Sequence, residues 1–471
     1  MGTTLSACAA VLALGQACLD AAQPEADTSL LMLIRGYSTQ KIIRLNVGEA
    51  FTFRLRAGGE RVLRLVSVQE HRDSVIGLVR RADVRVEIDG RPLDLVCAPY
   101  VMPTESAGLR IMADTTTAWL PKLPKRVQFS LWDADEPIVD TTRFGFPLRN
   151  YRLLSHGTQA YNEPVHLGAR DGDPTGQRFY HNYGFDLAGY EGADEVVSAI
   201  EGQVVKLTPT PEGVWVRDSQ GFTCAYRHLA AVEPGLAVGT RIRRGQKLGL
   251  LGRAGGSGNF SHLHIDPGPL SNTLNLYPWL VTAYRARRPK GLFAVARPHH
   301  LVRVGEKELL DGSNSLAFGG RIVEWRWVFH DGQTVRQVRA EKAFDRPGAY
   351  VAALWVKNDK GAVDVDFCQV KVFSKADPES AMPHIFMTST PTEGIRPGQP
   401  VRFRFWFQGR GDGPTQVDFG DGTTMADYRS YKEVSHGFAA PGIHIVTAHR
   451  EAGGMPITAK LKVVVDMPGP R

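Results

Sequence analysis

Hydrophobic and polar residues alternate with a period of two over most of this chain. Between Ser38 and Leu148, alternating stretches are separated by turns rich in Gly, Pro and Asp. This alternation indicates β-strands with one buried face. The stretches are residues 51–55, 62–66, 84–88 and 127–131. They predict a β-sandwich-like module at residues 23–150, and the same pattern further along predicts an all-β, multidomain protein.

The chain is too long for one hydrophobic core. At 471 residues it exceeds the usual size of a domain. A basic stretch at Arg285–Gly291 and a polar stretch at Ser374–Ser380 are suited to exposed linkers. The breaks predict the N-terminal module, a central domain at residues 151–287 and two C-terminal domains at residues 292–374 and 381–467.

The two C-terminal segments repeat one motif loosely. Each has a strand leading to an Asp-Gly turn, then an aromatic-rich Pro-Gly corner and then a last strand. The first copy is residues 323–332, 343–350 and 370–373, and the second is residues 417–422, 437–444 and 461–465. Both resemble PKD domains, although the second lacks the leading Trp and the first has His330 at a usual Gly. The resemblance implies immunoglobulin-like sandwiches that act as spacers or contact a polysaccharide or protein.

Three histidines fall within one short, strand-rich segment of the central domain. His228 follows Tyr226-Arg227, and His262 and His264 flank Leu263. In an extended strand, residues two apart point to the same side, so His262 and His264 project together while Leu263 and Ile265 face the core. This grouping predicts a metal site.

The central domain resembles the lysostaphin/LytM-type zinc metallopeptidases. The resemblance lies in a set of motifs that occur in the family's order, and it implies a compact antiparallel β domain with a narrow substrate groove. The motifs are residues 176–187, 195–205, 226–229, 238–249 and 252–264. The activity implied is endopeptidase cleavage of peptide bonds, with peptidoglycan cross-links as the expected substrate.

Site residues follow from this resemblance. Asp186 and His264 match two metal ligands, and His262 and His228 match the two catalytic histidines that bind no metal. The implied cofactor is Zn²⁺, which lowers the pKa of a bound water toward about 7. His262 is expected to transfer protons and His228 to stabilise the oxyanion.

The first metal ligand departs from the family pattern H-x-G-x-D. Asn182 occupies the position of the His, Tyr183 follows it, and His181 lies five residues before Asp186. A β-bulge would bring His181 onto the face of Asp186, so we predict that His181 is this first ligand and completes the set of three with Asp186 and His264. His166 or His156 could take its place, and otherwise the site is degenerate.

Three function classes follow. The first is a zinc endopeptidase of the bacterial cell wall, with Gly255–Asn259 as a flexible edge of the groove. The second is a catalytically degenerate relative that binds peptidoglycan or regulates another cell-wall hydrolase. The third, nucleic-acid binding, rests only on the net charge of +7 and lacks an aromatic and basic recognition motif. We therefore expect no specific nucleic-acid partner.

The N-terminal sequence predicts export. Ala7–Leu14 is a short apolar run followed by small residues, which is typical of a signal segment at residues 1–22. Leu5–Cys8 resembles a lipoprotein box, which would apply if the start codon is misassigned. We expect a periplasmic, cell-surface or secreted protein without a transmembrane segment. Cys97, Cys224 and Cys368 are expected to be buried thiols.

Overall fold

The computed structural model describes most of the chain, and the fold and site are built from that part. The described residues are 34–149, 151–154, 156–166, 179–208, 213–254, 260–268, 273–374, 382–409, 413–428 and 432–467. The predicted signal segment lies outside them.

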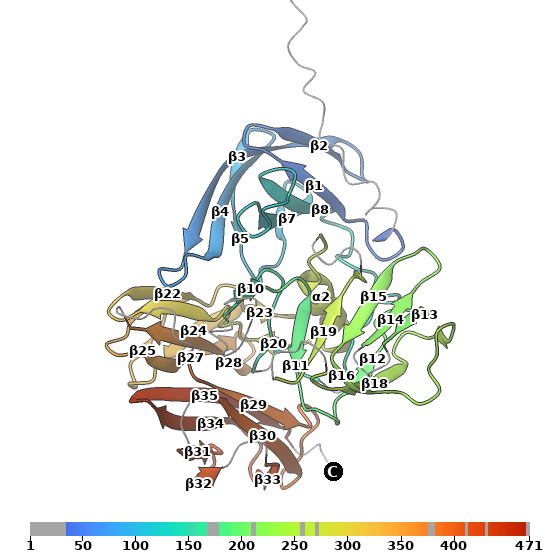
Figure 1. Ribbon diagram of the computed structural model, residues 1–471. Coiled ribbons are helices and arrows are strands. Elements are labelled where there is room, and N and C mark those ends of the chain that lie inside the picture. Colours follow the sequence, from blue (N-terminus) through green and yellow to red (C-terminus); the bar gives the residue numbers. More distant parts are fainter. Residues whose placement is uncertain are drawn as a thin grey trace, which may run out of the picture.

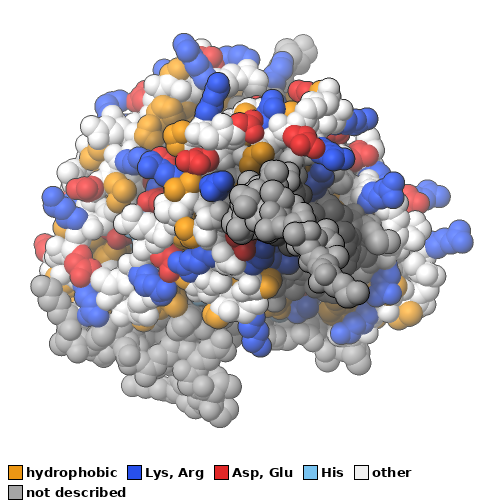
Figure 2. Space-filling model, turned by 90° about the horizontal axis from the view of Figure 1, so that it is seen from above, with side chains coloured by type: hydrophobic (Ala, Val, Ile, Leu, Met, Phe, Trp, Pro, Cys, Tyr) orange, Lys and Arg blue, Asp and Glu red, His pale blue; other side chains and the backbone are white. Residues whose placement is uncertain are grey.

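The N-terminal module consists of two four-stranded antiparallel sheets. One has the order β1-β8-β7-β6 and the other β2-β3-β4-β5, and the two share one hydrophobic core. Seen from above this module, basic and acidic side chains are interspersed on the surface (Figure 2). The strands are β1 Lys41–Leu45, β2 Ala50–Arg54, β3 Glu60–Arg72, β4 Val79–Ile88, β5 Arg91–Cys97, β6 Thr104–Ser106, β7 Leu109–Thr116 and β8 Val127–Asp133.

The central domain is built on a six-stranded sheet with the order β11-β19-β15-β14-β13-β17. A three-stranded sheet, β12-β18-β16, and the pair β10-β9 complete it (Figure 1). The strands are β9 Pro164–His166, β10 Phe179–His181, β11 Phe185–Ala188, β12 Glu195–Val197, β13 Gly202–Leu207, β14 Gly213–Arg217, β15 Thr223–Arg227, β16 Leu229–Val232, β17 Arg241–Ile242, β18 Lys247–Leu251 and β19 His262–Asp266.

One helix, α2 (Tyr277–Arg287), closes the core of this domain. Its buried Trp279 and Tyr284 pack in one cluster with residues of β11, β15 and β19. Tyr37 and Tyr100 of the N-terminal module belong to the same cluster. The N-terminal module therefore shares a core with the central domain.

The C-terminal part contains two sandwich-like units joined edge to edge. The units meet where β27 and β35 pair in parallel, at Ala349 and Ile457, within a nine-stranded sheet (Figure 1). The first unit has β20 Leu292–Phe293, β21 His300–Arg303, β22 Lys307–Asp311, β23 Leu316–Ala317, β24 Ile322–Val328, β25 Thr334–Val335, β26 Arg339–Ala343, β27 Gly348–Asn358 and β28 Val363–Phe373. The second has β29 His384–Thr390, β30 Pro400–Gln408, β31 Thr415–Asp418, β32 Thr424–Tyr428, β33 Val434–Gly437, β34 Gly442–Ala452 and β35 Met455–Val465.

The prediction of an all-β, multidomain protein is confirmed, while the exact domain limits stay predictions. Among the described residues, no helix is both long and apolar enough to cross a bilayer. Cys97, Cys224 and Cys368 are buried free thiols, as expected.

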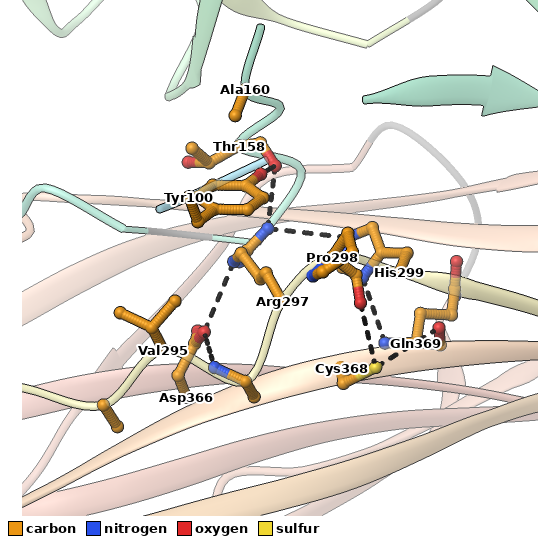
Figure 3. Close-up of polar contacts among 12 residues, drawn as sticks. Tyr100, Thr158, Ala160, Val295, Arg297, Pro298, His299, Asp366, Cys368 and Gln369 are labelled. Atoms are coloured by element: carbon orange, nitrogen blue, oxygen red, sulfur yellow. Dashed lines mark hydrogen bonds and ion pairs between the residues drawn. The ribbon is translucent and has the colours of Figure 1, made fainter. Parts of the chain in front are cut away.

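The buried guanidinium of Arg297 contacts both the central domain and the first C-terminal unit. Arg297 follows β20, and its side chain is only 1% exposed. It donates to the carbonyl oxygen of Thr158 at 2.8 Å and lies 3.4 Å from the carboxylate of Asp366 in β28. The hydroxyl of Tyr100 lies 2.9 Å from the same carbonyl and 2.5 Å from the Glu163 carboxylate. Figure 3 shows Arg297 between Tyr100 of the N-terminal module, Thr158 of the central domain and Asp366 of the first C-terminal unit.

We predict that Arg297→Met lowers the free energy of unfolding by about 3–5 kcal/mol, because it leaves the buried Asp366 carboxylate without its cation. The control Arg321→Met removes a side chain that is 83% exposed and should cost less than about 0.5 kcal/mol. Equilibrium denaturation with urea measures both. An Arg297→Met protein as stable as the control would contradict the role given to this network.

Candidate functional site

Two neighbouring strands place Asp186 beside His264. β11 and β19 are antiparallel, and Asp186 pairs directly with His264 across them. The Nδ1 atom of His264 lies 2.7 Å from Oδ1 of Asp186, and Nε2 of His262 lies 3.8 Å from the same oxygen. Leu263 and Ile265 point into the core behind the sheet. The strand therefore separates the histidines from the core in the way that its alternation predicts.

His228 joins this group through a turn in the backbone. It lies between β15 and β16 and has a φ of 64°, a left-handed conformation that is uncommon for a residue with a side chain. Its ring centroid is 4.7 Å from that of His262 and 6.0 Å from that of His264. Asp186, His228, His262 and His264 thus form one cluster, which we call the histidine cluster.

Hydrogen bonds to carbonyl oxygens assign the tautomers of two of these histidines. Nδ1 of His228 lies 2.7 Å from the carbonyl oxygen of Ala254, and Nδ1 of His262 lies 3.1 Å from that of Phe260. A carbonyl oxygen only accepts, so each Nδ1 carries the proton and each neutral ring keeps a lone pair on Nε2. Burial lowers the pKa of His228, and it lowers that of His262 to about 4. Both rings are therefore neutral bases near pH 7.

This tautomer changes the expectation for His228. Stabilising an oxyanion requires an N–H donor that faces the substrate. Neutral His228 already uses its N–H on Ala254, so it offers an acceptor instead. It can act as a donor there only after it has taken up a proton.

Two carboxylates flank His264. Asp186 lies on one side, and the Oδ2 atom of Asp266 lies 3.4 Å from Nε2 of His264 on the other. Burial by itself lowers the pKa of His264, but the Asp186 and Asp266 carboxylates outweigh it and raise the pKa to about 9. Burial by itself raises the pKa of Asp186, and His262 and His264 outweigh it and lower that pKa.

His181 lies in a different sheet from Asp186 and His264. It ends β10, which pairs with β9 in a separate two-stranded sheet, opposite Pro164. Burial and the positive charge of Arg80, in the N-terminal module, lower the pKa of His181 to about 4. The pairing of β11 with β19 contains no bulge. The bulge expected to bring His181 onto the face of Asp186 is therefore absent from this pairing, and the role of His181 as a metal ligand stays a prediction.

The alternative ligands, His156 and His166, stay predictions. His156 is half-buried, and its ring centroid lies 5.8 Å from that of His384 in the second C-terminal unit. The side chain of His166 lies outside the described residues, as does Gly255–Asn259, the expected groove edge. Tyr183 packs edge-on against His264 at 4.8 Å, and its hydroxyl accepts a hydrogen bond of 2.9 Å from Arg227.

The side chains as they lie do not fit a three-ligand zinc centre. Within the part of the chain that the structure describes, no group of three or more His, Cys, Asp or Glu residues is arranged to hold a metal. The pair of Asp186 and His264 nevertheless brings one carboxylate and one imidazole together, and both are typical zinc donors. His264 also leaves its Nε2 without a hydrogen-bond partner. Two of the three predicted ligands therefore already lie side by side.

Several neighbours of the cluster were not predicted from the sequence. Asp266 continues the same strand alternation two residues after His264, so the spacing H-x-H-x-D could have identified it. Phe260 stacks on His262 with centroids 4.2 Å apart and on Phe386 at 5.3 Å. Phe386 stacks in turn on Trp406. The last two belong to the second C-terminal unit, and no local pattern signals a contact so distant in sequence.

Comparison with known proteins identifies two segments. Residues 180–270 match the model of Peptidase family M23, and residues 293–372 match that of the PKD domain. The first match contains every residue of the histidine cluster.

Solved structures that resemble the chain include peptidases and PKD domains. A putative glycyl-glycine endopeptidase LytM from Ruminococcus gnavus is 19% identical over 31% of this chain and 61% of its own, with a TM-score of 0.20. A zinc-containing peptidase from Vibrio cholerae is 16% identical over 44% of this chain and 82% of its own, with a TM-score of 0.20. The PKD1 domain of the Vibrio cholerae metalloprotease PrtV is 28% identical over 15% of this chain and 94% of its own, with a TM-score of 0.13.

These structural likenesses are too low to carry a conclusion about function, which rests on the family models. The chain carries a segment that matches peptidase family M23, followed by a PKD domain, and the family match supports a peptidase.

Proposed function

We propose that this protein is a zinc-dependent endopeptidase that hydrolyses peptide cross-links of peptidoglycan. The observation that carries the proposal is the convergence of Asp186, His228, His262 and His264 within the segment that matches the peptidase family. A protein that only binds a polymer has no need for two neutral histidines whose Nδ1 atoms are held by backbone carbonyl oxygens. Proton transfer gives both of them a role.

The chain's own residues divide the work as follows. Asp186 and His264 are the proposed zinc ligands, and bound zinc would supply a Lewis acid and a water of lowered pKa. His262 accepts a proton at Nε2 from the attacking water and passes it to the leaving amine. His228, 4.7 Å from His262 between ring centroids, is the second base and becomes a donor to the oxyanion once protonated.

We place this activity outside the cytoplasm, on the cell wall. The net charge of +7 suits an anionic polymer surface. We also propose that the C-terminal units hold a polysaccharide or protein of the wall near the histidine cluster. The aromatic stack from His262 through Phe260 and Phe386 to Trp406 brings the second unit next to the cluster.

One observation favours a second candidate, the catalytically degenerate relative that binds peptidoglycan or regulates another hydrolase. Asn182 stands where the family pattern has its first histidine ligand, four residues before Asp186, and its side-chain amide donates to the carbonyl oxygen of Gln159 at 3.3 Å. With His181 in another sheet, the third ligand is missing from the described cluster. A site that never completes its ligand set would bind without cleaving.

Metal content and cleavage together separate the two candidates. We expect the wild type to bind about one zinc per chain and to release new amines from purified peptidoglycan, whereas His264→Ala should lose both. His181→Ala tests the third ligand, and the partly exposed His449→Ala is the control. Elemental analysis and amine labelling measure the two properties.

Each result supports or contradicts one of the two candidate functions or one residue assignment. Zinc-bound wild type that cleaves none of several wall types would overturn the peptidase and favour the binder. If His181→Ala keeps its zinc and its activity, His181 is not a ligand. Equal losses in His449→Ala and His264→Ala would show that the effect is not specific to the cluster.

The absence of a side chain at Gly184 leaves room for the ring of His264. A Cβ atom at this position would lie 2.7 Å from Nε2 of His264 and 2.7 Å from the backbone oxygen of Ile265. Real Cβ contacts are never so short, and the backbone oxygen cannot move without breaking the sheet. Only glycine therefore lets the ring lie against the chain before Asp186.

We predict that Gly184→Ala lowers kcat/KM on peptidoglycan fragments by at least about 10²-fold, because a displacement of about 1 Å in a catalytic group has effects of that size. Gly413→Ala is the matched control, since an added Cβ there meets nothing closer than 3.9 Å. Steady-state kinetics on both variants check this. An unchanged kcat/KM in a folded Gly184→Ala protein would contradict the assigned position of His264.

A further inference from the structure

The six-stranded sheet of the central domain has two different faces. One face is apolar and packs into the core through Val204, Val214, Val216, Tyr226 and Ile265. The other face carries the histidine cluster on β11 and β19. Because residues alternate along each strand and partners share a face, the pairing register identifies every residue on this second face.

Basic residues continue the second face away from the cluster. Arg227 on β15 pairs directly with His264 on β19. Trp215 and Arg217 on β14 pair with Ala225 and Thr223, two and four residues before Arg227. Lys206 on β13 pairs with Trp215, Gln203 pairs with Arg217, and Arg241 on β17 pairs with Gln203. We call Lys206, Trp215, Arg217, Arg227 and Arg241 the basic sheet face.

Most of the positive charge on this face is not neutralised. Arg227 lies 3.4 Å from Asp266, a carboxylate that is itself fully buried. Lys206, Arg217 and Arg241 are exposed, and among the described residues none of the three has a carboxylate within ion-pair distance. Three cations without a carboxylate partner among the described residues favour an anionic ligand on this face.

Trp215 holds two of the cations in place. Nζ of Lys206 lies 4.4 Å from the centre of the indole and the guanidinium carbon of Arg227 lies 5.6 Å from it, both within the range of cation–π contacts. The partly exposed indole therefore fixes these side chains above the sheet. Arg227 also donates to Tyr183, so its position next to His264 is set from two sides.

We propose that the basic sheet face binds an acidic peptide, one that carries free carboxylates, as the arm of the substrate on this side of the scissile bond. The proposal rests on the peptidase function proposed above and names its substrate class. Neighbouring strands lie roughly 4.8 Å apart, so β13 is roughly 14 Å from β19. An extended peptide of about four or five residues spans this distance. A peptide held at the histidine cluster therefore reaches Lys206 and Arg217.

The test is binding to the full-length protein in the presence of a chelator, so that cleavage plays no part. The probes are acetyl-(Gly-Glu)₄-amide, its neutral analogue acetyl-(Gly-Gln)₄-amide and an oligodeoxythymidylate. The variant is Lys206→Gln/Arg217→Gln/Arg241→Gln. The control, Arg64→Gln/Arg91→Gln/Arg396→Gln, removes the same charge from exposed positions in the N-terminal module and the second C-terminal unit.

We expect the wild type and the control to bind the acidic peptide about tenfold more tightly than the neutral one at low salt, and the variant to lose this preference. Added salt should weaken the preference in the wild type. Melting curves establish that the variant is folded.

Three results would overturn the proposal: equal affinity of the wild type for both peptides, an equal loss in the control, or tighter binding of the oligonucleotide than of the acidic peptide. The outcome is separable from that of the proposed function. If the protein binds the acidic peptide but cleaves no peptidoglycan, only the proposed peptidase activity is contradicted. If it cleaves peptidoglycan without preferring acidic peptides, only the proposed role of the basic sheet face is contradicted.

Discussion

The buried guanidinium of Arg297 is the constraint on which the arrangement of the units depends. A charge taken out of water is tolerated only when its partners are all in place. Here the partners come from separate units: the Thr158 carbonyl from the central domain and the Asp366 carboxylate from the first C-terminal unit. Tyr100 adds the N-terminal module through the same carbonyl. The network therefore forms only when the units are docked together.

This docking gives the units beyond the central domain a part in the site. The second C-terminal unit stacks Phe386 on Phe260, which stacks on His262. Its Thr390 donates to the buried Asp194 of the central domain at 2.9 Å. The basic stretch Arg285–Gly291 begins in the last turn of α2, and residues 285–290 are exposed, as expected of a linker, yet Arg288 reaches Glu393 at 2.6 Å. The second C-terminal unit is thus packed against the central domain next to the site.

The sequence predicted those features that depend on local alternation. The all-β fold and the common face of His262 and His264 follow from a period of two, because that period is a property of the strand itself. The position of His181 could not be predicted in this way. It depends on where the chain leaves one strand and pairs with Pro164 in another sheet. The contact of Phe386 with Phe260 depends on docking between units, and the tautomer of His228 on the Ala254 carbonyl.

The central claim is that Asp186 and His264 form the preformed part of a zinc site inside the histidine cluster. Anomalous scattering at the zinc edge from crystals of the full-length protein tests it most directly. The account predicts one peak at about 2.0–2.2 Å from a carboxylate oxygen of Asp186 and from a ring nitrogen of His264. Zinc held by other residues, or no bound zinc at saturating concentration, would contradict it.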